Sequence, residues 1–375
     1  MLYFDNNATT QIDEQVLDVF NDVLKNSYGN AGSIYPYGEK SKQLVLTARR
    51  QVAELLNASI ENIIFTSCAT ESNNAIINSC SASATLAKKH IITTSVEHPS
   101  ILNPLYNLEK CGYEIDLLSV DDCGRINLAE LSAKLRAETL LVSIMFVNNE
   151  VGNIYPIKQA VELVKSYNSE IMFHTDAVQA IGKLKVDVSD LGVDFLSFSG
   201  HKFHAPKGVG GFFVKEPQKF TPLLFGGEQE FGLRSGTEDV PSIVAIGKAA
   251  SIIDIDTEVS TLSVLRDKIE RAITTMYADT KIIGDIENRV CNTANLLIPG
   301  VNGVTLVASL GESDVCVSSG SACSAKDKGQ SHVLNAMGIE GKSIRISLSR
   351  FTTKEEVQRF VSILLQTVKK IQSKE

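Results

Sequence analysis

Residues 195–202, Phe195-Leu196-Ser197-Phe198-Ser199-Gly200-His201-Lys202, join a largely apolar strand to a lysine. A strand of this composition is typical of a sheet that is covered on both faces. The lysine that follows it would lie at the carboxyl edge of the sheet, where α/β folds bind their ligands. Partial desolvation there would favour the neutral amine that forms a Schiff base. The alternative is a surface lysine in a turn, because the glycine-rich run 206–211 comes next.

Other segments before residue 240 have the same strand character and alternate with helical patterns. Leu44, Ala48, Val52, Leu55 and Leu56 recur at the spacing of one helix face. Strands that alternate with helices indicate an α/β domain with a mainly parallel sheet. The expected strands are 63–66, 90–95, 113–118, 140–147, 171–175 and 195–199.

The pattern changes after about residue 240. One long helical stretch, 243–277, precedes separated strands at 294–298 and 343–347, which indicates a second, smaller α+β domain. Thr352 and Thr353 each have a glutamate three residues later and predict the start of a final helix. Its apolar stripe is expected to face the core: Val357, Val361, Leu364, Val368 and Ile371.

Polar residues follow three more of the predicted strands. Asp176 comes directly after the strand that begins at residue 171 and could pair with a protonated ring nitrogen, although a helix N-cap is the simpler alternative. Residues 66–74 are rich in Ser, Thr and Asn and lead into a helix, so they could bind an anion or simply cap that helix. His98 could stack on the ring of a ligand and carry a proton, or it could be an ordinary loop histidine.

Together these strand-end residues match the requirements of pyridoxal phosphate (PLP). A lysine supplies the Schiff base, an aspartate pairs with the pyridinium, a helix start holds the phosphate and a histidine stacks on the ring. No nucleotide motif competes with this interpretation, since the glycine run 206–211 contains neither G-x-G-x-x-G nor G-x-x-x-x-G-K-[ST].

Composition excludes several other classes. The 375 residues carry 36 Lys and Arg against 44 Asp and Glu, a net charge of −8 without charged blocks, so nucleic-acid binding is not expected. The seven cysteines form no C-x-x-C pair, and neither a disulfide framework nor a stable metal site is expected. The start of the sequence lacks a signal-peptide pattern, and no long apolar window suggests a membrane segment; we therefore expect a cytoplasmic protein.

At this point the sequence resembles the cysteine desulfurases of the NifS/IscS type. These belong to the class-V aminotransferases, within the aspartate-aminotransferase-like PLP fold type I. The resemblance runs nearly end to end and rests on ordered motifs: Asp5-Asn6-Asn7-Ala8-Thr9-Thr10, Ala69-Thr70-Glu71-Ser72-Asn73-Asn74, Glu97-His98, Val147-Asn148-Asn149-Glu150-Val151-Gly152, His174-Thr175-Asp176-Ala177-Val178-Gln179, Ser199-Gly200-His201-Lys202, Arg234-Ser235-Gly236-Thr237, Ser319-Gly320-Ser321-Ala322-Cys323 and Arg350-Phe351-Thr352-Thr353.

The resemblance implies a role for individual residues. Lys202 would form the Schiff base and move protons, Asp176 would pair with the pyridinium, and His98 would stack on the ring and assist proton transfer. Gln179 and Asn149 would lie near the phenolic oxygen. The phosphate would be held by Ala69, Thr70, Ser199, His201 and, from a second subunit, Thr237. Arg350, helped by Asn30 and Arg234, would bind the substrate carboxylate.

Cys323 distinguishes desulfuration from transamination in this interpretation. It lies in a stretch of small polar residues, which predicts an exposed loop. A thiolate on such a loop can take the substrate's sulfur as a persulfide. The resemblance implies conversion of L-cysteine to L-alanine by a homodimer. An iron–sulfur scaffold or tRNA-thiolation protein would accept the sulfur, with at most a transient cluster contact at Cys323. The other six cysteines are expected to be buried or inert.

Alternatives remain at this stage. If the protein is a selenocysteine lyase or an aminotransferase-like enzyme, Cys323 has no role in the reaction. If it is a non-catalytic scaffold subunit, it needs none of the candidate catalytic residues. The sequence also departs from the family pattern at Cys68, Ala31 and Phe203-His204-Ala205. The predicted division is a large PLP-binding domain, 14–255, and a small domain made of 1–13 and 256–375, which carries the Cys323 loop.

Overall fold

The computed structural model describes residues 1–84, 88–320 and 331–373. Its centre is a seven-stranded sheet in the order β2-β8-β7-β6-β5-β3-β4, in which only β8 runs antiparallel to its neighbours. The mainly parallel α/β architecture expected from the sequence is therefore confirmed. The strands are β2 (Ile63–Thr66), β3 (His90–Thr94), β4 (Glu114–Leu118), β5 (Thr139–Ser143), β6 (Met172–Asp176), β7 (Phe195–Ser199) and β8 (Gly210–Val214).

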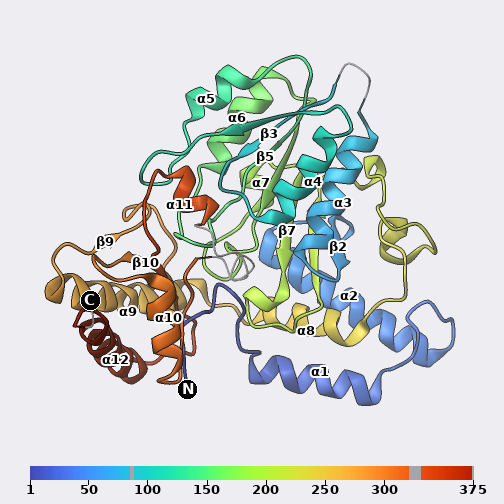
Figure 1. Cartoon of the computed structure of the whole chain (residues 1–375). Helices are drawn as coiled ribbons and strands as arrows, with labels where there is room; N and C mark the ends of the chain where they lie inside the picture. Colours follow the sequence, from blue (N-terminus) through green and yellow to red (C-terminus); the bar gives the residue numbers. More distant parts are fainter. Residues whose placement is uncertain (85–87, 321–330, 374–375) are drawn as a thin grey trace.

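Helices cover both faces of this sheet (Figure 1). Side chains alternate along the strands, so that Ile64 packs towards one group of helices and Ile63 and Phe65 towards the other. One face is covered by α3 (Ala69–Ala82) and α4 (Pro99–Glu109). The other is covered mainly by α2 (Pro36–Leu56), α5 (Leu128–Lys134), α6 (Ile157–Tyr167), α7 (Val188–Leu191) and α8 (Val240–Ser251), with α1 (Glu14–Asn26) outside α8.

Strand β8 was not predicted, because its first two residues are glycines in a run that resembles a turn. The structure shows why glycine stands there. A Cβ on Gly211 would lie 2.5 Å from Phe198 Cζ, and one on Gly210 would lie 2.9 Å from the carbonyl carbon of Cys68. The two glycines let the reversed strand fit closely between β2 and β7.

Two predicted elements were wrong in extent. The stretch 243–277 is not one helix but two, α8 and α9 (Ile255–Met276), because Asp254 caps α9 by accepting the backbone N–H of Thr257. Strand β5 stops at Ser143 rather than residue 147. The residues after Ser143 no longer pair with the neighbouring strands as part of β5, and they form a wall of the site described below.

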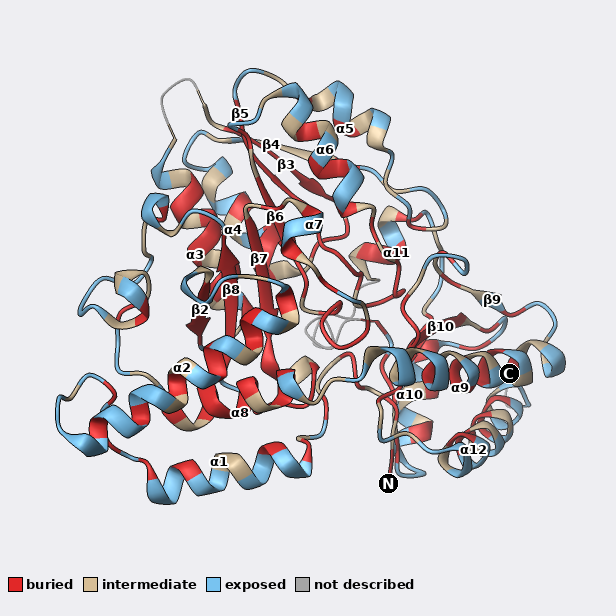
Figure 2. Ribbon diagram, turned by 180° about the vertical axis from the view of Figure 1, so that it is seen from behind, coloured by how far each residue is buried: buried red, intermediate tan, exposed pale blue. Residues whose placement is uncertain are grey.

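A second apolar cluster lies beside a small three-stranded sheet, β12-β10-β9 (Figure 2). It contains Leu2 and Phe4 from the start of the chain, because β1 (Leu2–Tyr3) pairs with β11 (Val315–Cys316). The predicted domain limits stay a prediction, which this separate cluster supports. The remaining elements are β9 (Lys281–Ile282), β10 (Thr293–Leu297), β12 (Ile344–Ser347), α10 (Gly303–Gly311), α11 (His332–Ala336) and α12 (Lys354–Gln372).

The final helix begins as expected. Thr353 accepts the Glu356 backbone N–H, and the Glu356 side chain accepts the Thr353 N–H, which completes a capping box. Val357, Leu364 and Val368 are fully buried. The apolar stripe is therefore part of the core, where α12 packs against α9 and α10.

Candidate active site

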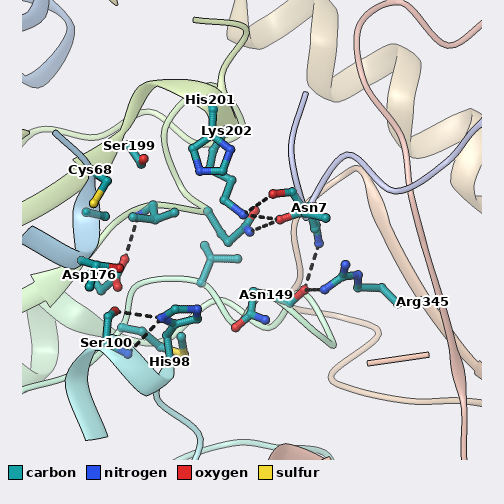
Figure 3. Close-up of a pocket in the computed structure, with 17 residues that line it drawn as sticks. Asn7, Cys68, His98, Ser100, Asn149, Asp176, Ser199, His201, Lys202 and Arg345 are labelled. Carbon is teal, nitrogen blue, oxygen red and sulfur yellow. Dashed lines mark hydrogen bonds between the residues drawn. The ribbon is translucent and has the colours of Figure 1, made fainter. Parts of the chain in front are cut away.

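The carboxyl ends of the parallel strands meet at one edge of the large sheet and border a cavity of about 220 Å³ (Figure 3). Residues far apart in the sequence come together there because each follows its own strand. Nine predicted site residues line the cavity: Ala69, Thr70, His98, Asn149, Asp176, Gln179, Ser199, His201 and Lys202.

Lys202 ends a short 3₁₀ turn, Gly200–Lys202, directly after β7. Its Nζ donates to the backbone carbonyls of Asn7, at 2.6 Å, and Ala8, at 2.9 Å. The amine therefore lies where the amino-terminal segment crosses the edge of the sheet (Figure 3). This contact brings the first polar motif of the chain, residues 5–10, into the site.

The start of α3 forms a second wall. The helix begins at Ala69, and no side chain in the described part of the chain caps it; Cys68 precedes it in an extended conformation. Because the first turn of a helix has unsatisfied backbone N–H groups and a positive dipole end, this geometry can hold a phosphate. Gly210 of β8 packs against the backbone of Cys68 and so shapes the same turn.

His201 and Ser199 border the cavity beside this helix start. Burial lowers the pKa of His201 to about 4, helped by the charge of Lys202. The ring is therefore neutral at neutral pH. Its Nδ1 pairs with Thr9 Oγ1 at 3.1 Å, which again joins the amino-terminal segment to the end of β7.

Asp176 is buried and is held by two donors. Its Oδ2 accepts a hydrogen bond from Asn73 Nδ2 at 3.0 Å, and its Oδ1 accepts the Val178 N–H at 3.0 Å. Asn73 Nδ2 also donates to Ser100 Oγ, which lies 2.8 Å from His98 Nδ1. Sequence reasoning assigned no role to Asn73 or Ser100, although Asn73 lies in the polar run that drew attention to the start of α3.

His98 is the N-cap of α4, and its Nδ1 accepts the Ser100 backbone N–H at 3.1 Å. Nδ1 is therefore unprotonated, and a neutral ring carries its proton on Nε2. Burial lowers the pKa of His98, against the opposing effect of the Asp176 carboxylate. The ring thus presents a neutral N–H donor rather than an imidazolium.

The loop after β5 and the amino-terminal segment close the remaining side. Asn7 Nδ2 donates to the Asn149 carbonyl at 3.2 Å, and Gln179 Nε2 donates to the Asn7 carbonyl at 2.9 Å. Arg345 Nη1 donates to the same Asn149 carbonyl at 3.0 Å (Figure 3). These bonds connect residues 7, 149, 179 and 345 across one wall of the cavity.

The arginines are arranged differently from the sequence-based prediction. Arg345 lines the cavity and is 1% exposed; its Nη2 donates to Asp5 Oδ1 at 2.7 Å, and its Nε has no hydrogen-bond partner among the described residues. Arg350 lies instead beside a smaller cavity, where its Nε is 3.5 Å from Glu258 Oε1. Sequence reasoning missed Arg345 because it lies within a strand, β12, rather than in a polar motif.

Three other predicted residues do not border the cavity in the single chain. Arg234 forms an ion pair with Glu71, with Nε 2.7 Å from Oε1. Asn30 and Thr237 are exposed. None of the three contributes to the site as one chain forms it, so a role for them requires a further structural element.

The cysteines divide into several environments. Cys323 lies outside the described residues. Cys80 and Cys291 are buried, and burial raises the pKa of the Cys291 thiol to about 11, as expected for inert thiols. Cys111 is exposed, so that its inertness stays a prediction, and Cys68 is half-buried and lines the cavity.

The cavity has the groups that PLP requires. A lysine amine, a buried carboxylate, an uncapped helix start and a neutral imidazole face one space, and each matches one chemical group of the cofactor. A profile of the aminotransferase class-V family matches residues 2–360. The chain therefore belongs to this family, whose members use PLP.

Its relatives define the branch more closely. It is 42% identical to a cysteine desulfurase of Nostoc sp., over 100% of this chain and 94% of that protein. It is 38% identical to the cysteine desulfurase NifS of Azotobacter vinelandii, over 96% and 90%. A solved NifS-like protein superposes with a TM-score of 0.93 at 37% identity, covering 98% of this chain and 99% of the other. The chain belongs to the cysteine desulfurase family.

No helix in the described part of the chain is long and apolar enough to cross a membrane.

Proposed function

We propose that this protein is a cysteine desulfurase that converts L-cysteine to L-alanine and transfers the sulfur to Cys323. One observation carries the proposal: Lys202, Asp176, His98 and the start of α3 border a single cavity at the edge of the sheet. The end-to-end similarity to cysteine desulfurases supports the choice of substrate.

The residues that would hold the cofactor follow from the cavity. Lys202 Nζ would hold the cofactor at its aldehyde group, and Asp176 would pair with the ring nitrogen. The backbone of Ala69 and Thr70, with Ser199 and His201, would bind the phosphate. Asn73 fixes the Asp176 carboxylate by the 3.0 Å hydrogen bond described above. When bound, PLP supplies an electron sink beside the substrate.

Arg345, rather than Arg350, is proposed to bind the substrate carboxylate. Its planar guanidinium lies in the cavity wall, whereas Arg350 faces Glu258 beside a different cavity. A guanidinium fork suits a carboxylate because it offers two parallel N–H donors. The hydrogen bonds to Asp5 and Asn149 hold the Arg345 side chain in place before the substrate arrives.

Two side chains move protons in this proposal. Lys202 Nζ, once free of the cofactor, accepts and returns a proton at the substrate carbon, since it is the amine at the cavity wall. His98 carries its proton on Nε2 and can deliver it there, because Ser100 occupies Nδ1. The lowered pKa of His98 keeps the ring neutral between turnovers.

The transfer to Cys323 balances without an added oxidant. The thiolate attacks the substrate sulfur, an S–S bond forms, and the substrate C–S bond breaks. The electron pair of that bond stays on the substrate carbon, which takes up a proton to give alanine. Cysteine plus one protein thiol therefore gives alanine plus one protein persulfide.

A homodimer would complete the site. Large apolar side chains are exposed near Asn30 and Thr237 in the chain: Tyr28 is 78%, Ile34 100% and Phe225 79% exposed. Burying such side chains against a second copy is favourable and would bring Thr237 to the partner's phosphate site. The persulfide would then pass, in the cytoplasm, to a sulfur-acceptor protein of iron–sulfur cluster assembly or tRNA thiolation.

The test compares wild type with Cys323→Ser and Lys202→Ala. We expect wild type to form alanine from L-cysteine and to gain one sulfur atom on Cys323 when reductant is absent. Cys323→Ser should retain the visible absorbance of the lysine-linked cofactor and lose alanine formation, and Lys202→Ala should lose both. Alanine formation at the wild-type rate by Cys323→Ser would refute the proposal and favour a neighbouring lyase or transaminase.

A further inference from the structure

Lys183 is a buried lysine to which the proposed reaction assigns no role. It is 7% exposed, and its ammonium forms no ion pair with a carboxylate in the described part of the chain. Both of its hydrogen bonds go to one residue: Nζ donates to Gln179 Oε1 at 3.0 Å and to the Gln179 carbonyl at 3.2 Å. A buried ammonium is costly unless it is bonded, so this choice of partner is informative.

The backbone after β6 turns sharply to make this contact. The Ile181 N–H donates to the Ala177 carbonyl at 3.2 Å, and the Lys183 N–H donates to the Ala180 carbonyl at 2.9 Å. Gly182 has a φ of 77°, a left-handed conformation that glycine adopts without strain. The turn therefore brings the Lys183 side chain back to the residue four positions earlier.

The lysine determines which way the Gln179 amide faces. Because an ammonium only donates, the amide atom beside it must be the oxygen. The amide nitrogen then faces the other way, where Nε2 donates to the Asn7 carbonyl at 2.9 Å, and Gln179 lines the cavity. Nε2 carries two hydrogens, of which the described residues accept one, so the second N–H is available to a ligand in the cavity.

The Gln179 amide lies beside the amine that would hold the cofactor. The Asn7 carbonyl that accepts from Gln179 Nε2 also accepts from Lys202 Nζ, at 2.6 Å (Figure 3). The two nitrogens therefore share one acceptor atom. On the ring of PLP the aldehyde and the phenolic oxygen are on adjacent carbons, so a cofactor held at Lys202 would bring its phenolic oxygen near the second N–H of Gln179.

Lys183 also places a positive charge behind this amide. Burial lowers the pKa of Lys183 to about 8, which still leaves the amine protonated at neutral pH. A cation at the oxygen of an amide polarises it and strengthens the hydrogen bonds that its N–H groups donate. The charged and titratable groups around Lys183 are Glu258, Arg350, His204, Cys291 and Arg345.

We propose that Lys183 is a positioning residue for the cofactor: its ammonium orients and polarises the Gln179 amide so that this amide donates a hydrogen bond to the phenolic oxygen of PLP. The inference rests on the cofactor placement in the proposed function and deepens it, since Lys183 acts through Gln179 and touches neither substrate nor cofactor. A donor at the phenolic oxygen stabilises its negative charge, which is greatest when the Schiff base is unprotonated. Lys183 should therefore tighten PLP binding and favour the unprotonated Schiff base.

Substitutions on both sides of the contact test the inference. Lys183→Met removes the ammonium and keeps a side chain of similar length, whereas Lys183→Arg keeps a cationic donor. Gln179→Glu keeps the acceptor for Lys183 and removes the donor, and Gln179→Leu removes the amide altogether. Lys165→Met is the matched control, because Lys165 donates to the Ile171 carbonyl and to Asp194 at the amino ends of β6 and β7, opposite the cavity.

The main measurement is the pH midpoint at which the visible absorbance of the lysine-linked cofactor changes, together with the PLP affinity of the apoprotein. We expect Lys183→Met to raise the midpoint by about one pH unit and to weaken PLP binding about tenfold. Gln179→Glu should raise the midpoint at least as far, and Lys183→Arg should stay close to wild type. Lys183→Met should add no further shift in the Gln179→Leu background. Lys165→Met should match wild type in both measurements.

Two results would overturn the inference. One is a wild-type midpoint and PLP affinity in both Lys183→Met and Gln179→Glu. The other is an undiminished midpoint shift when Lys183→Met is added to Gln179→Leu, which would show that the lysine does not act through the amide. Failure of the proposed function is a separate result, since wild type would then bind PLP, with a measurable midpoint, and form no alanine.

Discussion

Arg345 and Arg350 are five positions apart, yet the fold gives them different surroundings. Arg345 lies on β12 and reaches the cavity, where Asp5 and the Asn149 carbonyl orient it. Arg350 follows the strand and faces Glu258, with its guanidinium 5.9 Å from the ring centroid of Phe351. At the scale of single residues, the motif Arg350-Phe351-Thr352-Thr353 signals the family, but the strand before it carries the arginine that borders the site.

Substituting each arginine by lysine separates the two roles. Arg345→Lys should raise KM for L-cysteine about 10- to 100-fold, because a lysine cannot form the paired hydrogen bonds of a guanidinium. Arg350→Lys is the matched control and should leave KM within about twofold of wild type. Steady-state alanine formation measures KM for both variants. A larger increase of KM in Arg350→Lys than in Arg345→Lys would instead indicate that Arg350 binds the substrate carboxylate.

At the scale of elements, the site depends on how β8 fits against the turn before α3. The reversed strand lies between β2 and β7, and its first residue, Gly210, touches the backbone of Cys68. Any side chain at that position would displace the turn before α3, which borders the cavity. The glycine is thus required by a close approach of two backbones, which no local sequence pattern reveals.

Gly210→Ala is therefore expected to weaken cofactor binding. Its Cβ would lie 2.8 Å from the Phe198 carbonyl oxygen and 2.9 Å from the Cys68 carbonyl carbon, so the turn must move. We expect PLP affinity, measured by titrating the apoprotein, to fall about tenfold, a loss of about 1.4 kcal/mol. Gly311→Ala is the control, since a Cβ there meets nothing within 4 Å. Unchanged affinity in Gly210→Ala would show that the turn adapts without cost.

At the scale of the whole molecule, several buried histidines link folding to protonation. Burial lowers the pKa of His174 to about 3 and that of His204 to about 4. Because the unfolded chain takes up these protons near pH 6.5, stability is complete above that pH and is lost as the pH falls towards the folded pKa. Glu97 acts in the opposite direction, since burial raises its pKa to about 8.

His174→Gln isolates one of these contributions. At about pH 8 we expect the variant to be less stable by about 1–2 kcal/mol, because His174 bonds Ser143 and Ser197 within the sheet. At about pH 5 the deficit should shrink or reverse, since glutamine binds no proton in the unfolded chain. Urea unfolding at the two pH values measures the change. A deficit that is independent of pH would contradict the assignment of a neutral buried ring.

The proposed dimer predicts a second whole-molecule effect. Replacing the exposed Ile34 and Phe225 by aspartate should convert the dimer to monomer, because charged side chains disfavour an apolar interface. The monomer should fold but bind PLP more weakly, since Thr237 then reaches no partner. Sedimentation equilibrium and a cofactor titration test both statements, and wild-type protein that sediments as a monomer would remove the basis for a shared site.

The sequence by itself determined the α/β class, the strands that carry Asp176 and Lys202, and the family. It could do so because apolar runs that end in polar residues are local patterns, and parallel strands place their carboxyl ends at one edge. Tertiary structure alone decided what is not local: the reversed strand β8, the break before α9, the position of Arg345 rather than Arg350 beside the cavity, and the Asn73 and Ser100 bridge between Asp176 and His98.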